Sequence, residues 1–219
     1  MEKNIDDLHK EVPGNYYHFG IKHNIFQKFW HEKRFQEVGK VVATIPSKKM
    51  LDIGCHGGKF TFEMSILIPG AKIYGIDISS QAISYAKKTY PKFSFRTGRA
   101  EKLPYSPNNF DLVTCLEVLE HVETPTLVIK EVRRVLKNGE HFVVLVPSEN
   151  WLFKLIWFFW IRFGPGRIWH HTHLQKFNGR RLENMLKKEG FQIIKKKTCL
   201  LDMLLLIDAK KLGATRKNR

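Results

Sequence analysis

Strand-length apolar runs alternate with segments of helical periodicity through the middle of the chain. The strand-like runs are 49–53, 72–76, 92–96, 110–115 and 140–146. The segments with apolar positions at helical spacing are 58–68, 79–89 and 125–136. Because strands and helices alternate with short turns between them, the pattern predicts right-handed crossovers and a parallel sheet covered by helices.

The pattern continues toward the C-terminus with one helix and two strands. Residues 178–189 begin with Asn178 in the place of a helix N-cap. Strand-like runs follow at 191–197 and 200–208. Together with the five earlier runs, these segments predict an α/β fold with a sheet of seven strands.

Two segments outside this alternation also have helical patterns. In residues 21–45 the apolar side chains recur at roughly helical spacing, and basic residues fill much of the remainder. We expect one or two basic amphipathic helices that form a cap over the site; a membrane-facing element is the alternative. Residues 151–163 form an apolar run of thirteen residues with three tryptophans. That run is too short for the roughly twenty residues that span a bilayer.

The apolar run 151–163 suits the boundary between lipid headgroups and acyl chains. Lys154 and Arg162 would lie about 80° apart around a helix, so both can reach the headgroups from one side. Tryptophans and basic residues are typical of helices that lie in a membrane interface. A lid helix packed on the protein's own core, or in a dimer interface, is the alternative.

The net charge of the chain predicts an anionic binding partner. Lys and Arg number 37 against 21 Asp and Glu, which gives a net charge of +16. A nucleic acid, a membrane surface and an acidic substrate all fit such an excess.

The cysteines and the N-terminus bear on the cellular compartment. Three cysteines, Cys55, Cys115 and Cys199, lack metal-ligand spacing and indicate buried thiols in a reducing environment. No apolar run occupies the first residues, so we expect no secretory signal. We expect a cytoplasmic location, with peripheral attachment to the inner face of the cytoplasmic membrane as the form favoured by the apolar run.

The first two core strands end in a pattern suited to a nucleoside. Leu51-Asp-Ile-Gly-Cys-His-Gly-Gly58 spans the end of the first strand, and Tyr74-Gly-Ile-Asp77 ends the second. Small residues allow a tight turn and a close approach of backbone N–H groups to a ligand. An acid after the second strand can accept hydrogen bonds from ribose hydroxyls. Ordinary turn glycines, with Asp77 as a helix N-cap, are the alternative.

With two further segments, the chain resembles the class I S-adenosylmethionine-dependent methyltransferases. The further segments are Gly98-Arg-Ala-Glu-Lys-Leu-Pro104 and Phe110-Asp-Leu-Val-Thr-Cys-Leu-Glu-Val-Leu-Glu-His-Val122. The resemblance implies a Rossmann-like, doubly wound, mostly parallel seven-stranded sheet, with a helical N-terminal cap and a helical insertion after the fifth strand. The expected parts are the cap (1–47), the cofactor-binding core (48–147), the apolar insertion (148–177) and the C-terminal helix with the last strands (178–219).

This resemblance assigns S-adenosylmethionine as the cofactor. The residues that it places at the cofactor are Asp52, Gly54, Cys55, Gly58, Asp77, Ile78, Ala100, Glu101 and Leu116. Two positions depart from the family pattern. His56 replaces the usual second glycine, so its imidazole must point away from the cofactor, and a positive φ would strain its backbone. Arg99 replaces a common aspartate and cannot accept a hydrogen bond from adenine.

A closer resemblance, to the ubiquinone-biosynthesis O-methyltransferases, concerns the methyl acceptor. It rests on residues 113–122 and on Thr172-His173 before Lys176-Phe177. It implies O-methylation of a lipid-soluble or lipid-linked small molecule, such as a phenolic quinone precursor, at the membrane surface. Enzymes that methylate base amines usually carry an Asn or Asp with two prolines and an aromatic residue after the fourth strand. This chain has no proline pair there, which makes nucleic acid the less favoured partner.

A phenol titrates near 10, so a base or a metal ion is expected beside the acceptor. The catalytic candidates are Glu117, His121 and His173, the last by resemblance alone. Glu117, Glu120 and His121 have the i, i+3, i+4 spacing of one helical face. Such a face would hold a divalent cation such as Mg²⁺; a metal-free site is the alternative.

Two other functions stay open at the level of sequence. An RNA methyltransferase is supported by the positive charge alone. A catalytically inactive module that binds S-adenosylmethionine is suggested by the departures at His56 and Arg99.

Overall fold

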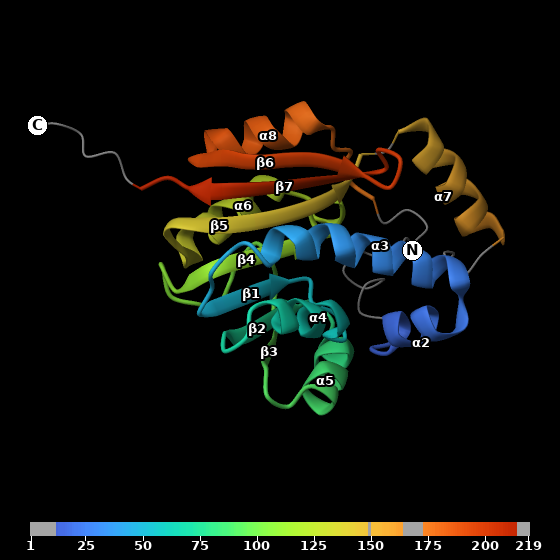
Figure 1. Cartoon of the computed structure of the whole chain (residues 1–219), viewed down its shortest axis with the longest axis horizontal. Coiled ribbons are helices and arrows are strands. Elements are labelled where there is room, and N and C mark those ends of the chain that lie inside the picture. Colours follow the sequence, from blue (N-terminus) through green and yellow to red (C-terminus); the bar gives the residue numbers. More distant parts are fainter. Residues whose placement is uncertain (1–11, 149, 164–172, 214–219) are drawn as a thin grey trace, which may run out of the picture.

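The structure is a computed structural model that describes residues 12–148, 150–163 and 173–213 (Figure 1). In this part of the chain one sheet has the strand order β3-β2-β1-β4-β5-β7-β6. The strands are β1 (Lys49–Ile53), β2 (Lys72–Asp77), β3 (Ser94–Thr97), β4 (Phe110–Leu116), β5 (Leu136–Pro147), β6 (Phe191–Cys199) and β7 (Leu204–Lys211). The first five strands pair in parallel, and β7 runs antiparallel to both β5 and β6. The predicted seven-stranded, mostly parallel sheet is confirmed.

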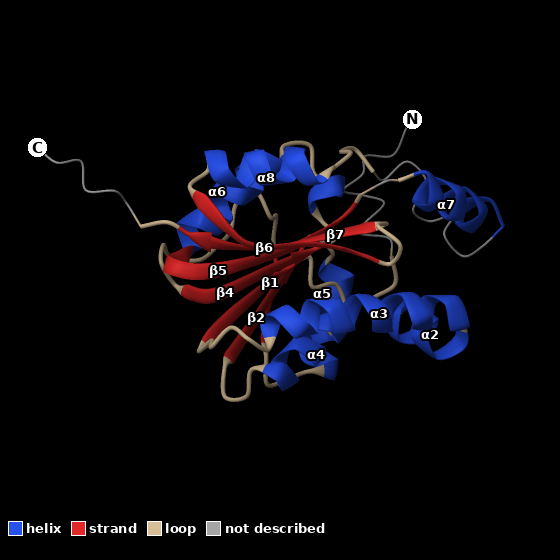
Figure 2. Cartoon of the chain, turned by 45° about the horizontal axis from the view of Figure 1, so that its top comes forward, coloured by secondary structure: helices blue, strands red, loops and turns tan. Residues whose placement is uncertain are grey.

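Helices cover both faces of the sheet (Figure 2). The described helices of the core are α4 (Lys59–Leu67), α5 (Ser80–Thr89), α6 (Pro125–Val135) and α8 (Gly179–Lys188). Those of the cap are α2 (Tyr16–His23) and α3 (Ile25–Val42), and the insertion after β5 forms α7 (Trp151–Phe163). α6 and α8 lie on one face of the sheet, and α3, α4 and α5 lie on the other.

Alternate residues of the central strands point to opposite faces, and this period of two builds two cores. Leu51 of β1 packs in the core that includes residues of α6 and α8, whereas Met50 packs in the core that includes residues of α3 and α4. β5 alternates in the same way, with Phe142 in the first core and Val143 in the second. Because these strands are buried on both faces, their sequences are nearly continuous apolar runs.

The cap helix α3 extends from the sheet toward the carboxyl ends of the parallel strands. Its C-terminal half buries Val38, Val41 and Val42 in the second core. Asn24 caps the other end of α3 by accepting from the amide of Gln27 at 3.0 Å. That end lies with α2 at the end of the molecule where α7 also projects (Figure 1). No helix in the three described ranges combines the length and the apolar character required to cross a bilayer.

Candidate active site

A cavity of about 1210 Å³ lies at the carboxyl ends of the parallel strands. Gly54 after β1, Asp77 at the end of β2 and Leu116 at the end of β4 are part of its wall. The sheet order places β2 and β4 on opposite sides of β1, so the strand order reverses here. In doubly wound sheets, ligands bind in the crevice at this reversal point.

Six of the nine predicted cofactor residues line this cavity. They are Gly54, Asp77, Ile78, Ala100, Glu101 and Leu116. The other three, Asp52, Cys55 and Gly58, are not part of its wall. Gly58 has a φ of 79° at the N-cap of α4, and Cys55 is buried, which raises the pKa of its thiol. These residues support the loop around the cavity.

Backbone amides hold the Asp77 carboxylate in place. It accepts from the amide of His56 at 2.8 Å and from the amide of Ser79 at 2.8 Å. Burial raises the pKa of Asp77, and the hydrogen bonds from these amides oppose that rise. A carboxylate fixed in this way beside an open cavity is suited to accept from ribose hydroxyls.

His56 has the positive φ that the glycine pattern implied, with a value of 45°. This conformation costs a non-glycine residue about 1–2 kcal/mol. Two contacts offset that cost. The His56 amide donates a hydrogen bond to Asp77, and the His56 ring packs edge-to-face on Tyr17 of α2 with 5.0 Å between centroids. The next residue also approaches the cap, since a Cβ on Gly57 would lie 2.1 Å from the carbonyl oxygen of Gly14. The loop after β1 is therefore tied to the N-terminal cap.

Asp52 lies in β1, beneath the loop. Its carboxylate accepts from the hydroxyl of Thr61 on α4 at 2.6 Å and from that of Thr114 on β4 at 2.7 Å. Burial is the main cause that raises its pKa, to about 6. Asp52 also lines a second, much smaller cavity of about 30 Å³, together with Arg34 and His56. It joins three elements of the core and borders the space beside Arg34.

Arg34 is a residue of the site that the sequence analysis missed. It belongs to α3, is 5% exposed and forms an ion pair with Glu117. Its Nη2 lies 3.0 Å from Nδ1 of His31, and its guanidinium carbon lies 4.1 Å from the centre of the Phe60 ring. Burial lowers the pKa of Arg34 to about 10, so the guanidinium stays charged at neutral pH. The sequence pattern of α3 places Arg34 among several basic residues and does not distinguish it from its exposed neighbour Lys33.

The expected helical face of Glu117, Glu120 and His121 does not form. Glu117 has a φ of 55°, and its amide donates to the carbonyl of Leu145 at 2.8 Å. Only the short 3-10 helix η1 (Leu119–His121) follows. A helical spacing brings side chains together only where the helix continues through all of them. The prediction of one shared face was therefore wrong, and Glu117 is directed to Arg34.

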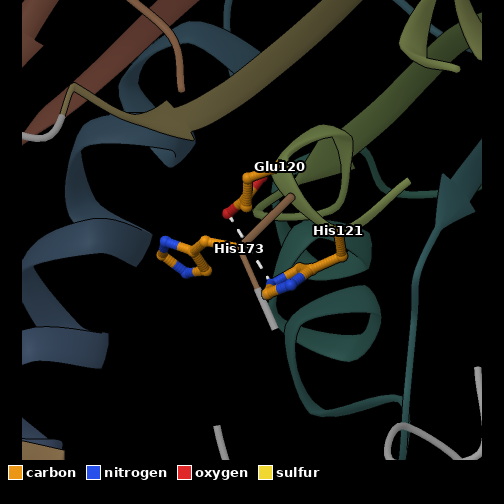
Figure 3. Close-up of side chains that lie close together, drawn as sticks. All are labelled: Glu120, His121 and His173. Carbon is orange, nitrogen blue, oxygen red and sulfur yellow. Dashed lines mark ion pairs between the residues drawn. The ribbon is translucent and has the colours of Figure 1, made fainter. Parts of the chain in front are cut away.

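A cluster of Glu120, His121 and His173 forms instead (Figure 3). One ligand atom from each of the three residues lies within 4.8 Å of the others. Oε1 of Glu120 is 3.9 Å from Nε2 of His121. The rings of His121 and His173 meet edge-on, with 5.0 Å between centroids. Glu120 and His121 were predicted as metal ligands, and His121 and His173 were predicted as catalytic residues.

Backbone hydrogen bonds bring His173 to this cluster. The amides of Leu174 and Gln175 both donate to the carbonyl oxygen of Glu120, at 2.8 and 3.0 Å. His173 is therefore held beside η1 although it lies about fifty residues further along the chain. Thr172, its partner in the predicted Thr-His pair, falls outside the described residues.

The donor chemistry of the cluster bears on the choice of ion. It offers two imidazoles and one carboxylate, whereas Mg²⁺ prefers oxygen ligands and retains its water. Zn²⁺ and similar transition metals accept such nitrogen-rich sets. The residues present fit a divalent transition metal better than the expected Mg²⁺.

Arg99 and Glu101 lie together on the cavity wall. Nη2 of Arg99 is 3.1 Å from Oε1 of Glu101. The arginine is about half exposed and the glutamate is less so. An acid is therefore present at the predicted adenine end, although position 99 itself carries none.

Apolar side chains surround the outer end of the cavity. Those that line it from α3, α7 and the segment between β6 and β7 are Phe26, Phe29, Trp30, Phe153, Ile156, Trp157, Leu200 and Leu201. Several of them are also open to solvent, with exposures of 75% for Phe26, 44% for Ile156 and 76% for Leu201. The cavity thus has a polar inner end and an apolar mouth.

Comparison with known proteins agrees with this geometry. The family model described as a methyltransferase domain matches residues 46–196. The ubiquinone biosynthesis O-methyltransferase of Dechloromonas aromatica is 36% identical over 121 residues, which cover 52% of this chain and 51% of that protein. The mitochondrial ubiquinone biosynthesis O-methyltransferase of Schizosaccharomyces pombe is 33% identical over 156 residues, 67% of this chain and 56% of that one. The chain spans about half the length of the curated relatives that it matches.

A solved structure extends the likeness in fold to nearly the whole chain. Magnesium protoporphyrin IX methyltransferase from Synechocystis PCC 6803, solved with bound SAH, superposes with a TM-score of 0.72. The match covers 94% of this chain and 98% of that one at 19% identity, a level that speaks for the fold alone. Because the family model covers more than half of the sequence, the chain belongs to the methyltransferase domain family, as its class I S-adenosylmethionine-dependent motifs predicted.

Proposed function

We propose that this protein is an S-adenosylmethionine-dependent methyltransferase that methylates a phenolic oxygen of a lipid-soluble small molecule at a membrane surface. The observation that carries the proposal is the shape of the cavity, with a nucleoside-type inner wall and an apolar mouth. Methyltransferases named for ubiquinone biosynthesis are among its relatives, which supports the same class of acceptor.

The inner wall offers groups for the ribose, the adenine and the methionine end of the cofactor. In this proposal Asp77 accepts from the ribose hydroxyls, and the Ala100–Glu101 segment lies along the adenine. Arg34 and Glu117 are complementary in charge to the carboxylate and ammonium of the methionine end. Glu117 then serves the cofactor, and the catalytic role first expected of it passes to the histidine cluster.

The reaction depends mainly on alignment and on the ionisation of the acceptor. The sulfonium methyl is already electrophilic, so the protein must hold the phenolic oxygen in line with it and exclude water. The cluster of Glu120, His121 and His173 lines the same cavity, where an imidazole nitrogen can receive the phenolic proton. A divalent ion held by these residues would, when bound, lower the pKa of the phenol as a Lewis acid.

The apolar mouth suits an acceptor that arrives from lipid. Phe26 and Ile156 each contribute to the cavity wall and are also exposed, so an apolar tail can leave the site between α3 and α7. Such a tail would be covered on two sides while the phenol stays at the polar end. A fully water-soluble acceptor would not require these exposed side chains.

The surface around the mouth has the composition of an interface with an anionic leaflet. α7 exposes Trp151, Phe158 and Phe159, with exposures of 74%, 59% and 52%. Each such side chain contributes about 1.5–3 kcal/mol when it moves from water into acyl chains. Basic residues of α3 and α7, together with the net charge of +16, favour anionic headgroups. We propose peripheral attachment to the inner face of the cytoplasmic membrane on these grounds.

Methyl transfer to a pair of matched catechols tests the proposal. One catechol carries a long alkyl tail and the other carries none, and both are offered in anionic vesicles with methyl-labelled S-adenosylmethionine. We expect label on a phenolic oxygen of the tailed compound, at a rate well above that of the short one, and no transfer by Asp77→Ala. Transfer to RNA alone, or to an amine, would contradict the proposed acceptor. Failure of the wild type to bind the cofactor in calorimetry would contradict the enzyme itself.

A further inference from the structure

Helix α7 has an inner and an outer face, and the inner face carries two stacked aromatic rings. Phe153 and Trp157 stand one helical turn apart, and their rings stack with 5.6 Å between centroids and 14° between planes. Phe153 is 5% exposed, and both residues line the cavity. The outer face carries the exposed residues Trp151, Phe158 and Phe159.

The inner face of α7 continues directly into the histidine cluster. The Trp157 ring stacks on His173 with 4.8 Å between centroids and 25° between planes. Phe153 lies nearly parallel to the same imidazole, at 6.1 Å and 16°. His173 also makes an edge-to-face contact with His121, with 5.0 Å between ring centroids. His173 therefore contacts both the aromatic rings of α7 and a residue of the cluster that the proposed function uses.

We propose that Trp157, supported by Phe153, is a positioning residue that sets the imidazole plane of His173. The backbone at Leu174 and Gln175 fixes where the segment lies, through the carbonyl of Glu120, but these backbone hydrogen bonds do not themselves set the side-chain torsions of His173. A stacked ring restricts those torsions to the orientation that faces His121. Trp157 itself touches no reacting atom and acts through His173.

The positioning role of Trp157 would couple the contact of α7 with a membrane to the orientation of His173. The face opposite Trp157 is the apolar surface proposed to meet lipid, so a rotation of α7 on a bilayer moves the ring that holds His173. The chemical relevance of this coupling depends on the proposed function of the histidine cluster. The stacking itself does not, which allows the two to be tested apart.

The direct test is NMR of the wild-type protein with labelled histidine, without lipid or acceptor. We expect an NOE between the Trp157 indole and the His173 ring, and a ring-current shift of the His173 Cε1 proton. Trp157→Leu should remove the shift, Trp157→Phe should restore most of it, and Trp151→Leu on the outer face should leave it in place. An absent NOE in the wild type, or a His173 resonance that Trp157→Leu does not move, would overturn the proposal even if one variant folds poorly.

Kinetics with the short catechol then tests positioning against a general structural effect. Trp157→Leu should lower kcat by about two- to tenfold, the range expected for one aromatic contact, with unchanged affinity for S-adenosylmethionine. Trp157→Phe should recover most of the rate. A loss of cofactor affinity equal to the loss of kcat would make Trp157 a structural residue only. If the wild type binds no cofactor while the NMR result holds, the proposed function fails and the positioning of His173 stands.

Discussion

The ion pair between Arg34 and Glu117 joins the N-terminal cap to the core. Removing it tests directly how much this contact contributes to the stability of the protein. The Arg34 side chain is 6% exposed and the Glu117 side chain is 19% exposed. Breaking a fully buried pair by removing one partner costs about 3–5 kcal/mol. Because water can reach Glu117 in part, we expect Arg34→Met to lower the free energy of unfolding by about 2–3 kcal/mol.

Urea denaturation of a double-mutant cycle measures the coupling. Glu117→Gln should destabilise the protein by a similar amount, because it leaves the buried guanidinium without its carboxylate. The double variant should be less destabilised than the sum of the two, by about 1–3 kcal/mol. Lys33→Met provides the matched control, since it removes the same charge at the neighbouring exposed position and should stay within about 0.5 kcal/mol of the wild type. A coupling energy near zero would refute the pair.

Ligand binding separates the structural role of Arg34 from its proposed role at the cofactor. A hydrogen bond to a charged group contributes about 1.5–3 kcal/mol, so Arg34→Met should weaken S-adenosylmethionine binding about 10- to 100-fold. Adenosine lacks the methionine end, and its affinity should change little. Calorimetry with both ligands checks this. Equal losses for the two would show that Arg34 only holds the cap against the core.

Three further predictions concern the loop, the buried acid and the cluster. Gly57→Ala should push the cap away from the loop, because the new Cβ would lie 2.1 Å from the Gly14 carbonyl oxygen, and calorimetry should find weaker cofactor binding. Gly213→Ala should bind the cofactor normally, since its new Cβ would meet no atom of the described residues within 4 Å. Burial raises the pKa of Asp52 from 3.8 to about 6, so between these pH values the carboxyl group is protonated in the native state and ionised in the unfolded state. The contribution of Asp52 to the free energy of unfolding therefore falls as pH rises through that window. Urea titrations at several pH values should find this slope, of order 1–3 kcal/mol in total, reduced in Asp52→Asn. Calorimetry of the metal-stripped protein should find Zn²⁺ bound more tightly than Mg²⁺, and His173→Ala should weaken the Zn²⁺ binding; preference for Mg²⁺ would contradict the nitrogen-rich site.

The sheet, and the strand ends that line the cavity, could be predicted because they follow from local patterns. Strands buried on both faces are continuous apolar runs. β1 ends at the expected residue, and β2 ends one residue beyond the expected position. Gly54 and Asp77 reach the cavity because Gly54 directly follows β1 and Asp77 is the last residue of β2. Positions fixed by strand ends carry over from sequence to structure with little dependence on the rest of the fold.

The other half of the site depends on contacts between distant segments. Glu117 has helical spacing to His121, but no helix joins them. The positive φ at Glu117 and the hydrogen bond from its amide to the carbonyl of Leu145 in β5 interrupt the helix. Arg34 has the sequence context of an exposed basic residue, and its burial depends on how α3 crosses the core. No periodicity in the sequence carries either fact, because both are decided by tertiary packing.

The division between predictable and unpredictable residues also bears on where acceptor specificity resides. The family match begins at residue 46, so α2 and α3 lie outside it, together with Arg34 and the aromatic residues that α3 contributes to the mouth. α7 lies within the match but is an insertion after β5, and its apolar side chains form the opposite side of the mouth. In the proposed function the shared core therefore holds the nucleoside part of the cofactor, and two elements attached to it line most of the acceptor end. Exchanging α3 or α7 with a relative should consequently change which acceptors react, while the affinity for adenosine stays the same.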